Sequence, residues 1–528
     1  MITETQLANL KIQANAAIST ADIIKLLIES DKDTPDYKKA VEGEDYYKRN
    51  QKIKSEDFTT TTVLESDPTD PDKTIENVFH NPNRSNQRIQ HRFLFNHVEQ
   101  KVSYIAGREP SITVDGAKAH ESGESGNDQW QLQNELAKTT NTMFRKQLLS
   151  LLRKASLEGK SWLHEYKDKN GKLKQAVIPR TEGVAIYDSS YEQEIVEFIR
   201  YYPVVLNIAG KELIGTKAEW WTDQDVTYWI DEGNGRYVKD SSYETNPAPH
   251  YWEIITVTGP DGVTQIEKSR TAKSWGKIPF IELANNSDKM TDLEIYKDLI
   301  DAYDLVASKG TNNLLDFNEF YAIIQGFGGE VASAVVRKLE VNRAVSINGD
   351  KGKVELKQYD LTMTGRIDWL KELWNAIHFF GCAVDTNADR IGNAPSGVSL
   401  EFQYSLLDLK ANNMITEAEL VLNDHFWFIT QDINRQNSKN YDPEEVAIQF
   451  NKSKITNNLE TVTMITQSDN IVPEKLLLQA HPLVKDADQA YKDLLEQRKE
   501  KMAQQREEFG NFGTTNPLGA KKDDKETE

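Results

Sequence analysis

The stretch that decides the fold is GRIDWLKELWNAIHFFGCAVDTNADRIGNAPSGVSLEFQYSLLDLKAN, which runs from Gly365 to Asn412. Its first part repeats apolar residues at steps of three and four, the period of one helix face, at Ile367, Leu370, Leu373, Trp374, Ile377 and Phe380. A second helix is predicted after Ser396, a suitable N-cap, with one stripe at Val398, Phe402, Leu406 and Leu409. Gly, Asn, Asp and Pro residues between the two helices break both helical and strand patterns. The stretch therefore predicts a loop held between two stiff helices, not a catalytic pocket.

Helices and strands alternate along the rest of the chain. Apolar periodicity predicts helices over 22–29, 89–105 and 130–158, from Thr291 onward, and over 458–467, 473–480 and 486–508. Between residues 160 and 281, short β-patterned runs alternate with Asn-Gly and Asp-Gly turn signals, which indicates an antiparallel meander. Runs at 320–324, 343–347, 353–356 and 445–450 also indicate strands. By contrast, the Thr-, Asp- and Pro-rich residues 59–73 indicate a loop or arm.

Composition restricts the classes of function. The 528 residues contain 63 Lys and Arg against 83 Asp and Glu, a formal net charge of −20. A protein that grips duplex DNA is expected to carry a basic face, because neutralising phosphates supplies most non-specific affinity. The single cysteine, Cys382, excludes an internal disulfide framework and a multi-cysteine zinc site. Because Cys382 follows the apolar residues Phe379 and Phe380, it is predicted to be a small buried hydrophobe.

The sequence contains no recognisable catalytic motif. The chain lacks a phosphate-binding loop, a His-Glu-x-x-His helix and a Gly-x-Ser-x-Gly elbow, so neither enzymatic activity nor a cofactor or metal is predicted. His91 and His97 are predicted on a basic helical face, which is solvated or paired to a neighbouring subunit. The helical spacing of Asp298, Asp301 and Asp304 fits a solvated helix face better than a set of metal ligands.

No membrane segment is predicted. The start of the chain lacks the features of a signal peptide, and no run approaches the roughly eighteen apolar residues of a membrane span. The expected place of synthesis is a cytosol.

The quoted stretch resembles a known family. The segments Gly392–Phe402 and Leu406–Ala411 are similar to the corresponding part of tailed-bacteriophage portal proteins, in the SPP1-type portal family. Further matching pieces follow in order along the chain, at 46–50, 96–107, 276–286 and 287–304. The resemblance covers roughly residues 40 to 500.

The resemblance implies an α+β portal-protein fold with long stem helices, a β-rich wing, a small α/β clip and a helical C-terminal crown. The implied segments are an N-terminal arm and helix (1–85), the wing (86–286), a stem helix (287–308), the clip (309–363), a second stem helix (364–383), a tunnel loop (384–397), a long wing helix (398–440), the crown (441–508) and a disordered tail (509–528). Length alone would instead suggest several independent domains.

The resemblance also implies that the 384–397 loops face a DNA channel, and the loop's residue types suit that role. Thr386, Asn387, Asn393 and Ser396 can make weak, exchangeable phosphate contacts. Asp385 and Asp389 discourage lasting adhesion, in keeping with the acidic chain as a whole, although many soluble proteins are acidic for solubility. Arg390 is the one obvious phosphate partner, and it could equally pair with Asp389 of the next subunit.

The family implies a function and a set of partners. The protein would form a homo-oligomeric ring, a dodecamer in virions, at one capsid vertex through which double-stranded DNA is packaged and ejected. Its other partners would be the terminase large subunit, the scaffold and major capsid proteins, and a head-completion (adaptor) protein, with assembly in the host bacterial cytoplasm. Two alternatives stay open: another capsid-associated ring or structural protein without a DNA channel, and an acidic-site nuclease or hydrolase.

Overall fold

The computed structural model shows a mixed helical and sheet protein of the α+β class, which confirms the predicted fold class. It describes residues 2–14, 19–67, 70–80, 84–118, 126–208, 211–233, 235–258, 265–316, 320–325, 353–358, 363–385, 397–453, 458–469, 471–481, 483–484 and 487–510. The chain divides into two compact units. One unit comprises 1–385 and 404–453, and the other comprises 386–403 and 454–528.

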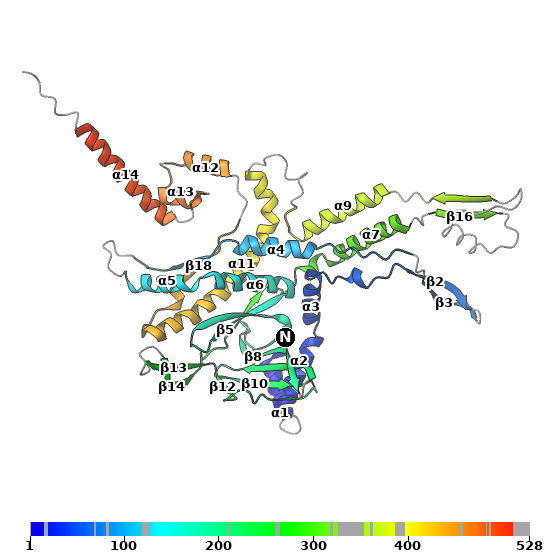
Figure 1. Cartoon of the computed structure of the whole chain (residues 1–528), viewed down its shortest axis with the longest axis horizontal. Coiled ribbons are helices and arrows are strands. Elements are labelled where there is room, and N and C mark those ends of the chain that lie inside the picture. The colour runs from blue at the N-terminus through cyan, green and yellow to red at the C-terminus, as the bar shows by residue number, and fades with distance from the viewer. Residues whose placement is uncertain are drawn as a thin grey trace, which may run out of the picture. The chain divides into compact units, whose positions relative to one another are not determined.

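The larger sheet of the first unit is mainly antiparallel (Figure 1). Its order is β1 (Ile2–Thr3), β7 (Gly183–Tyr187), β8 (Ile195–Ile208), β9 (Lys211–Trp221), β10 (Asp225–Asp231) and β11 (Tyr237–Lys239), with β12 (Ala248–Pro249) beside β10. Strands β7 to β11 pair consecutively and antiparallel, whereas β1 joins β7 in parallel. Helix α2 (Thr20–Asp33) packs on this sheet, because Ile24 and Leu27 share a core with Ile199 and Trp220. An antiparallel meander over β7 to β11 and the predicted helix over 22–29 are thus confirmed.

The prediction that one meander extends over the whole of 160–281 is wrong. Strands β5 (Lys160–Lys167) and β6 (Leu173–Pro179) form a separate sheet with β15 (Phe280–Ala284). Residues 161–165 are all buried, so β5 shows no alternation of apolar and polar positions. Strands β13 (Tyr251–Thr258) and β14 (Gln265–Lys273) pair only with each other among the described strands.

Helices of the first unit share one apolar core. Members of this core come from α3 (Pro35–Tyr47), α4 (Phe93–Ala106), α5 (Asp128–Thr139), α6 (Thr142–Glu158) and α11 (Gly397–Asn437). The single helix predicted over 130–158 is wrong, because α5 ends at Thr139 and α6 begins at Thr142. The side chain of Asn141 accepts hydrogen bonds from the amides of Met143 and Phe144, at 2.9 and 3.2 Å, and so caps the new helix.

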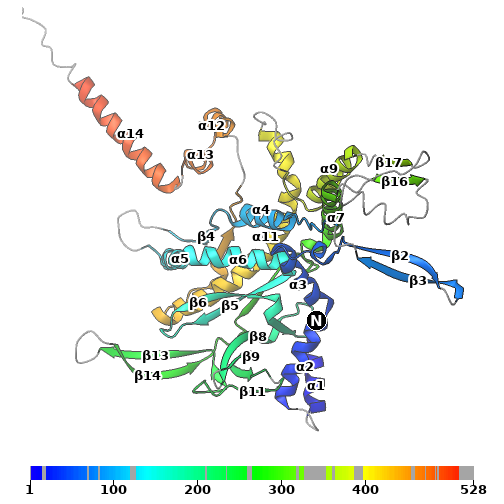
Figure 2. The same cartoon turned by 45° about the vertical axis from the view of Figure 1, so that its right-hand side comes forward.

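Helices α7 (Lys297–Asp316) and α9 (Met363–Phe380) lie side by side in both views (Figures 1 and 2). Between them in the chain, β16 (Phe320–Gln325) pairs antiparallel with β17 (Lys353–Gln358). The helix start predicted at Thr291 is present as a capping box, with Thr291 and Glu294 each accepting the other's backbone amide. A short 3-10 turn (Leu293–Ile295) then precedes α7. The strand predicted over 343–347 lies outside the described residues.

An extended segment over 84–92 runs along α7 and corrects two predictions. Asp304, Ser308, Asn312 and Asp316 recur every fourth residue of α7, and their side chains accept backbone amides from His91, Ile89, Gln87 and Ser85 at 2.6 to 3.1 Å. The spacings match, because four helical residues and two extended residues both advance about 6 Å. Residues 89–92 are therefore not helical, and Asp304 is buried instead of solvated.

The polar segment predicted as a loop or arm forms a β-hairpin, so a structureless loop is wrong, whereas an arm stays a prediction. Strand β2 (Thr60–Asp67) pairs with β3 (Asp70–His80), with Thr62 opposite Val78. The threonine run that suggested a loop consists of β-branched residues, which favour strands. Helix α1 (Glu4–Ala14) precedes this region in the chain. After it come the strands β4 (Ser111–Val114) and β18 (Val446–Gln449), which pair with each other.

The second unit is helical where it is described. It contains α12 (Asn458–Gln467), α13 (Glu474–Ala480) and α14 (Ala487–Gly510), which confirms the three helices predicted there. Arg498 of α14 forms an ion pair with Glu474 of α13 at 2.5 Å. The tail was predicted to begin at residue 509, but residues 509 and 510 belong to α14. Residues 511–528 lie outside the described residues.

Candidate functional site at the base of the predicted tunnel loop

Only one of the predicted DNA-facing residues falls within the described part of the chain. Asp385 is described, whereas Thr386, Asn387, Asp389, Arg390, Asn393 and Ser396 lie outside the described residues. The indole Nε1 of Trp374 donates a hydrogen bond to the carboxylate of Asp385 at 3.2 Å. Asp385 therefore lies against α9 at the point where the predicted loop begins.

Helix α9 ends in a Schellman motif, three residues earlier than the predicted boundary at 383. The amide of Cys382 donates to the carbonyl of Phe379 at 3.2 Å, and the amide of Ala383 donates to that of His378 at 3.0 Å. Cys382 occupies the left-handed position of the motif with φ 53°, where glycine is usual. It is only half-buried, so the prediction of a buried hydrophobe is wrong.

A glutamine of α4 fixes the chain after this turn. The side-chain amide of Gln100 donates to the carbonyl of Val384 at 3.1 Å, and its Oε1 accepts the Val384 amide at 3.0 Å. Both backbone groups of Val384 are thus paired, as they would be in a sheet, and its side chain is buried. This double hydrogen bond fixes the position of Val384, the first residue of the predicted loop.

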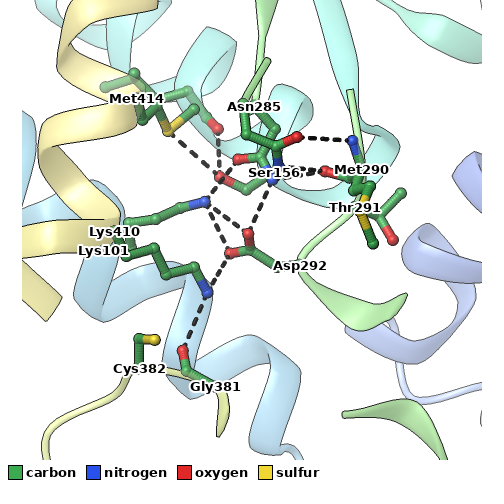
Figure 3. Close-up of polar contacts among 12 residues, drawn as sticks. Lys101, Ser156, Asn285, Met290, Thr291, Asp292, Gly381, Cys382, Lys410 and Met414 are labelled. Atoms are coloured by element: carbon green, nitrogen blue, oxygen red, sulfur yellow. Dashed lines mark hydrogen bonds and ion pairs between the residues drawn. The ribbon is translucent and has the colours of Figure 1, made fainter. Parts of the chain in front are cut away.

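A buried charge cluster lies behind the turn (Figure 3). The Lys101 ammonium of α4 lies 2.8 Å from a carboxylate oxygen of Asp292 and donates to Asn285 Oδ1 at 2.7 Å. Lys410 of α11 lies 3.1 Å from Asp292 and donates to the carbonyl of Gly381 at 3.0 Å. Asn285 in turn donates to Asp292 at 2.9 Å. One carboxylate therefore joins α4 to α11, and Lys410 also satisfies one of the last carbonyls of α9.

The charges of this cluster stabilise one another. Burial alone would raise the pKa of Asp292, but the neighbouring Lys101 and Lys410, together with the hydrogen bonds from Lys101 and Asn285, hold that pKa well below its usual range. Burial lowers the pKa of Lys101 to about 8, although the charge of Asp292 opposes this shift. The cluster is a fixed support, because each charge is held by a partner of opposite sign.

His97 packs beside the cluster and is neutral. Burial, with the nearby His378 and Lys410, lowers the pKa of His97 to about 3. The ring centroids of His97 and His378 are 5.0 Å apart, and His97 also contacts Tyr296 at 5.2 Å. The predicted basic, solvated face is therefore wrong for this residue, and His91 lies outside α4, paired with Asp304 at 2.8 Å.

The sequence prediction missed the residues that build this support: Gln100, Lys101, Asn285, Asp292 and Lys410. One signal was available for Lys101, because it lies on the stripe of Leu94, Val98 and Ile105 at helical steps of three and four. A lysine on an apolar stripe indicates a buried partner of opposite charge. The partner itself, Asp292, is 191 residues away and had no local signal.

No described helix is both long and apolar enough to cross a membrane. Nor does the described part of the chain hold a group of three or more His, Cys, Asp or Glu side chains arranged for a metal ion.

Comparison with known proteins gives a family. Residues 27–504 match the model of the family described as phage portal protein, SPP1 Gp6-like. The chain belongs to this portal family. It is 27% identical over 433 residues to the portal protein of Bacillus phage SPP1, a match that covers 81% of this chain and 79% of the relative. It is 26% identical over 453 residues to the portal protein of Clostridium phage phiCD119, covering 83% and 91%.

Among solved structures, the chain is similar to one titled virion of native gene transfer agent (GTA) particle. The TM-score is 0.39 at 10% identity, over 74% of this chain and 90% of that chain. The assignment to the portal family rests on the family match and on the two relatives.

Proposed function

We propose that the chain forms a homo-oligomeric ring at one vertex of a phage capsid, through which double-stranded DNA is packaged and later ejected. The observation that carries this proposal is the portal-family match over residues 27–504. The ring would be a dodecamer in the virion, assembled in the host bacterial cytoplasm. It would dock the terminase large subunit, scaffold and major capsid protein, and later a head-completion protein.

The described structure supports assigning the stem and clip to 287–383. Helices α7 and α9 flank the β16–β17 pair, the order helix, strand pair, helix that the stem and clip would need. Several large apolar side chains of the two helices are exposed in the single chain, including Leu314, Trp369 and Phe379. Exposed apolar side chains on long helices suit contacts between neighbouring subunits of a ring.

The tunnel loop would contact the duplex while its first arm stays fixed. Val384 is held by Gln100, and the turn before it is held by Lys410, so motion of the loop would be confined to the residues beyond Asp385. Within the loop, Arg390 would contact phosphate, the polar residues would make exchangeable contacts, and Asp389 would limit adhesion. The net charge of −20 also favours passage over gripping.

The test is the mass and shape of the purified full chain, by light scattering with negative-stain imaging. A ring of about a dozen subunits with a central hole wide enough for a duplex is expected. A closed oligomer without such a hole would instead favour a structural role without a DNA channel. In a phage that depends on this protein, replacing Asp389 and Arg390 together is expected to change packaging rate or packaged DNA length. Unchanged packaging and infectivity would show that the loop only connects the two helices and has no role in packaging.

A further inference from the structure

A groove of the first unit is lined by more cationic than anionic side chains. Its volume is about 680 Å³, and it lies where the α5–α6 junction, the β5–β6 and β13–β14 hairpins and the end of α11 meet. Five of its lining residues are Lys or Arg and three are Asp or Glu, in a chain whose overall charge is −20. The local excess is therefore opposite in sign to that of the whole protein.

The three carboxylates of the groove are already paired. Asp432 lies 2.5 Å from the ammonium of Lys167, Glu135 lies 2.7 Å from Lys138, and Glu253 lies 3.4 Å from Lys273. Three cations of the lining, Lys172, Lys174 and Arg435, have no ion pair among the described residues. Lys172 and Lys174 interact electrostatically with Asp168 without forming an ion pair, so Arg435 is the cation of the lining with no carboxylate beside it among the described residues.

Arg435 is the most constrained of these cations. Its guanidinium lies 5.0 Å from the ring centre of Tyr251 and 5.3 Å from that of Trp275. Lys167 contacts the same two rings, at 4.5 and 5.6 Å. Two cations thus share one aromatic pair, but only Lys167 has a carboxylate. The Nη1 of Arg435 is buried with no hydrogen-bond partner among the described residues, and burial lowers the pKa of this guanidinium. The residue as a whole is partly exposed and lines the groove, so the remainder of its guanidinium can meet an acceptor from outside the chain.

We propose that this groove binds an acidic peptide segment of a partner protein, with a carboxylate of the partner joining the Arg435 guanidinium. A guanidinium presents a planar fork that fits a carboxylate. Lys172 and Lys174 at the β6 end of the groove attract further acidic side chains. Apolar lining, including Leu173, Ile254 and the 52% exposed Met143, gives non-polar side chains of the same segment a place to pack.

A nucleic-acid backbone fits these observations less well than a peptide. Glu135, Glu253 and Asp432 would repel a continuous row of phosphates, whereas a peptide can direct individual carboxylates toward individual cations. The apolar side chains of the groove also have no counterpart on a phosphate backbone. The proposal depends only on this surface of the chain and stands apart from ring formation.

Binding of a labelled peptide to the full-length protein tests the proposal. The probe is a short fluorescein-labelled peptide of alternating glutamate and leucine, and the charge control is the same peptide with glutamine in place of glutamate. Fluorescence anisotropy is expected to show salt-sensitive binding of the acidic peptide only. Arg435→Gln is expected to weaken that binding about tenfold, since it removes the central partner of the carboxylate.

Two further variants keep the test independent of folding. Lys172→Gln combined with Lys174→Gln changes only the rim and is expected to weaken binding several-fold with an unchanged circular dichroism spectrum. Lys239→Gln removes an exposed lysine of β11, outside the groove, and is expected to bind as the wild type does. Absence of binding to the wild type, or equal binding by all variants, would overturn the proposal. So would duplex DNA that displaces the peptide and itself depends on Arg435.

Discussion

Two regions of the first unit hold wholly or partly buried lysine or arginine side chains, and they differ in whether each cation contacts a carboxylate of the chain. Beside the turn that ends α9, Lys101 and Lys410 converge on Asp292, to which Asn285 also donates a hydrogen bond. In the groove, Lys167 and Arg435 flank one aromatic pair, but only Lys167 has a carboxylate. A cluster in which every charge contacts an opposite charge of the same chain serves to hold elements together, whereas a cation without such a contact indicates a partner outside the chain. Unfolding measurements can separate the two cases.

The largest effect is expected from removing the shared carboxylate of the complete cluster. Asp292→Ala leaves two buried cations without a counter-charge and also removes an acceptor for Asn285. We expect a loss of about 3 to 5 kcal/mol in the free energy of unfolding, the usual cost of breaking a buried pair. Urea or thermal unfolding followed by circular dichroism measures this loss. The control Asp288→Ala, at an exposed position nearby, is expected to change it by no more than about 0.5 kcal/mol. Equal behaviour of the two variants would show that the cluster is not a support.

A second effect is expected in acid, at the histidine beside that cluster. His97 has a folded pKa of about 3, below its unfolded value of about 6.5. Its contribution to stability is therefore complete above pH 6.5 and is lost as the pH falls toward 3. The expected slope is about 1.4 kcal/mol per pH unit. His97→Leu, which cannot titrate, is expected to have a shallower decline in unfolding free energy over this range.

A histidine elsewhere in the same unit provides the comparison. Burial also lowers the pKa of His164 to about 3, opposed by its hydrogen bond to the carbonyl of Pro279. His164→Leu is expected to reduce the acid slope to a similar extent, since each variant removes one buried neutral histidine. A variant that keeps the full wild-type slope would show that its histidine does not couple folding to protons.

Much of the secondary structure follows from local pattern, whereas the support at the loop base does not. The stripe from Ile367 to Ile377 predicted α9, and its buried members Leu373 and Ile377 face the core. The end of α9 was placed too late because Cys382 adopts a left-handed conformation that glycine would have signalled. A helical period also cannot tell which polar residues will be buried. Asp304 became buried only because the distant segment 84–92 lies along α7.

The same reasoning explains what could be anticipated of the candidate site. Residue chemistry and family resemblance predicted the loop between the two helices, but the residues that fix its base come from α4, α11 and the segment before α7. Gln100 pairs with a backbone 284 residues away, and no spacing rule relates two such positions. The groove around Arg435 had no sequence signal either, since its cations come from four separate elements.

The smallest expected effect gives the sharpest contrast with Asp292. Arg435→Met removes a cation that has no carboxylate, so it abolishes the cost of burying that charge while losing its contact with Tyr251 and Trp275. A contact of this kind contributes about 0.5 to 1 kcal/mol, and relief of the burial cost offsets it, so we expect unfolding free energy to change by no more than about 0.5 kcal/mol. Lys167→Met is the matched control, because the same aromatic pair is retained while Asp432 loses its cation. That variant is expected to be the less stable of the two by thermal unfolding. If Arg435→Met were as destabilised as Lys167→Met, Arg435 would be a structural residue of the folded chain. Its lack of a carboxylate partner would then no longer indicate an external partner.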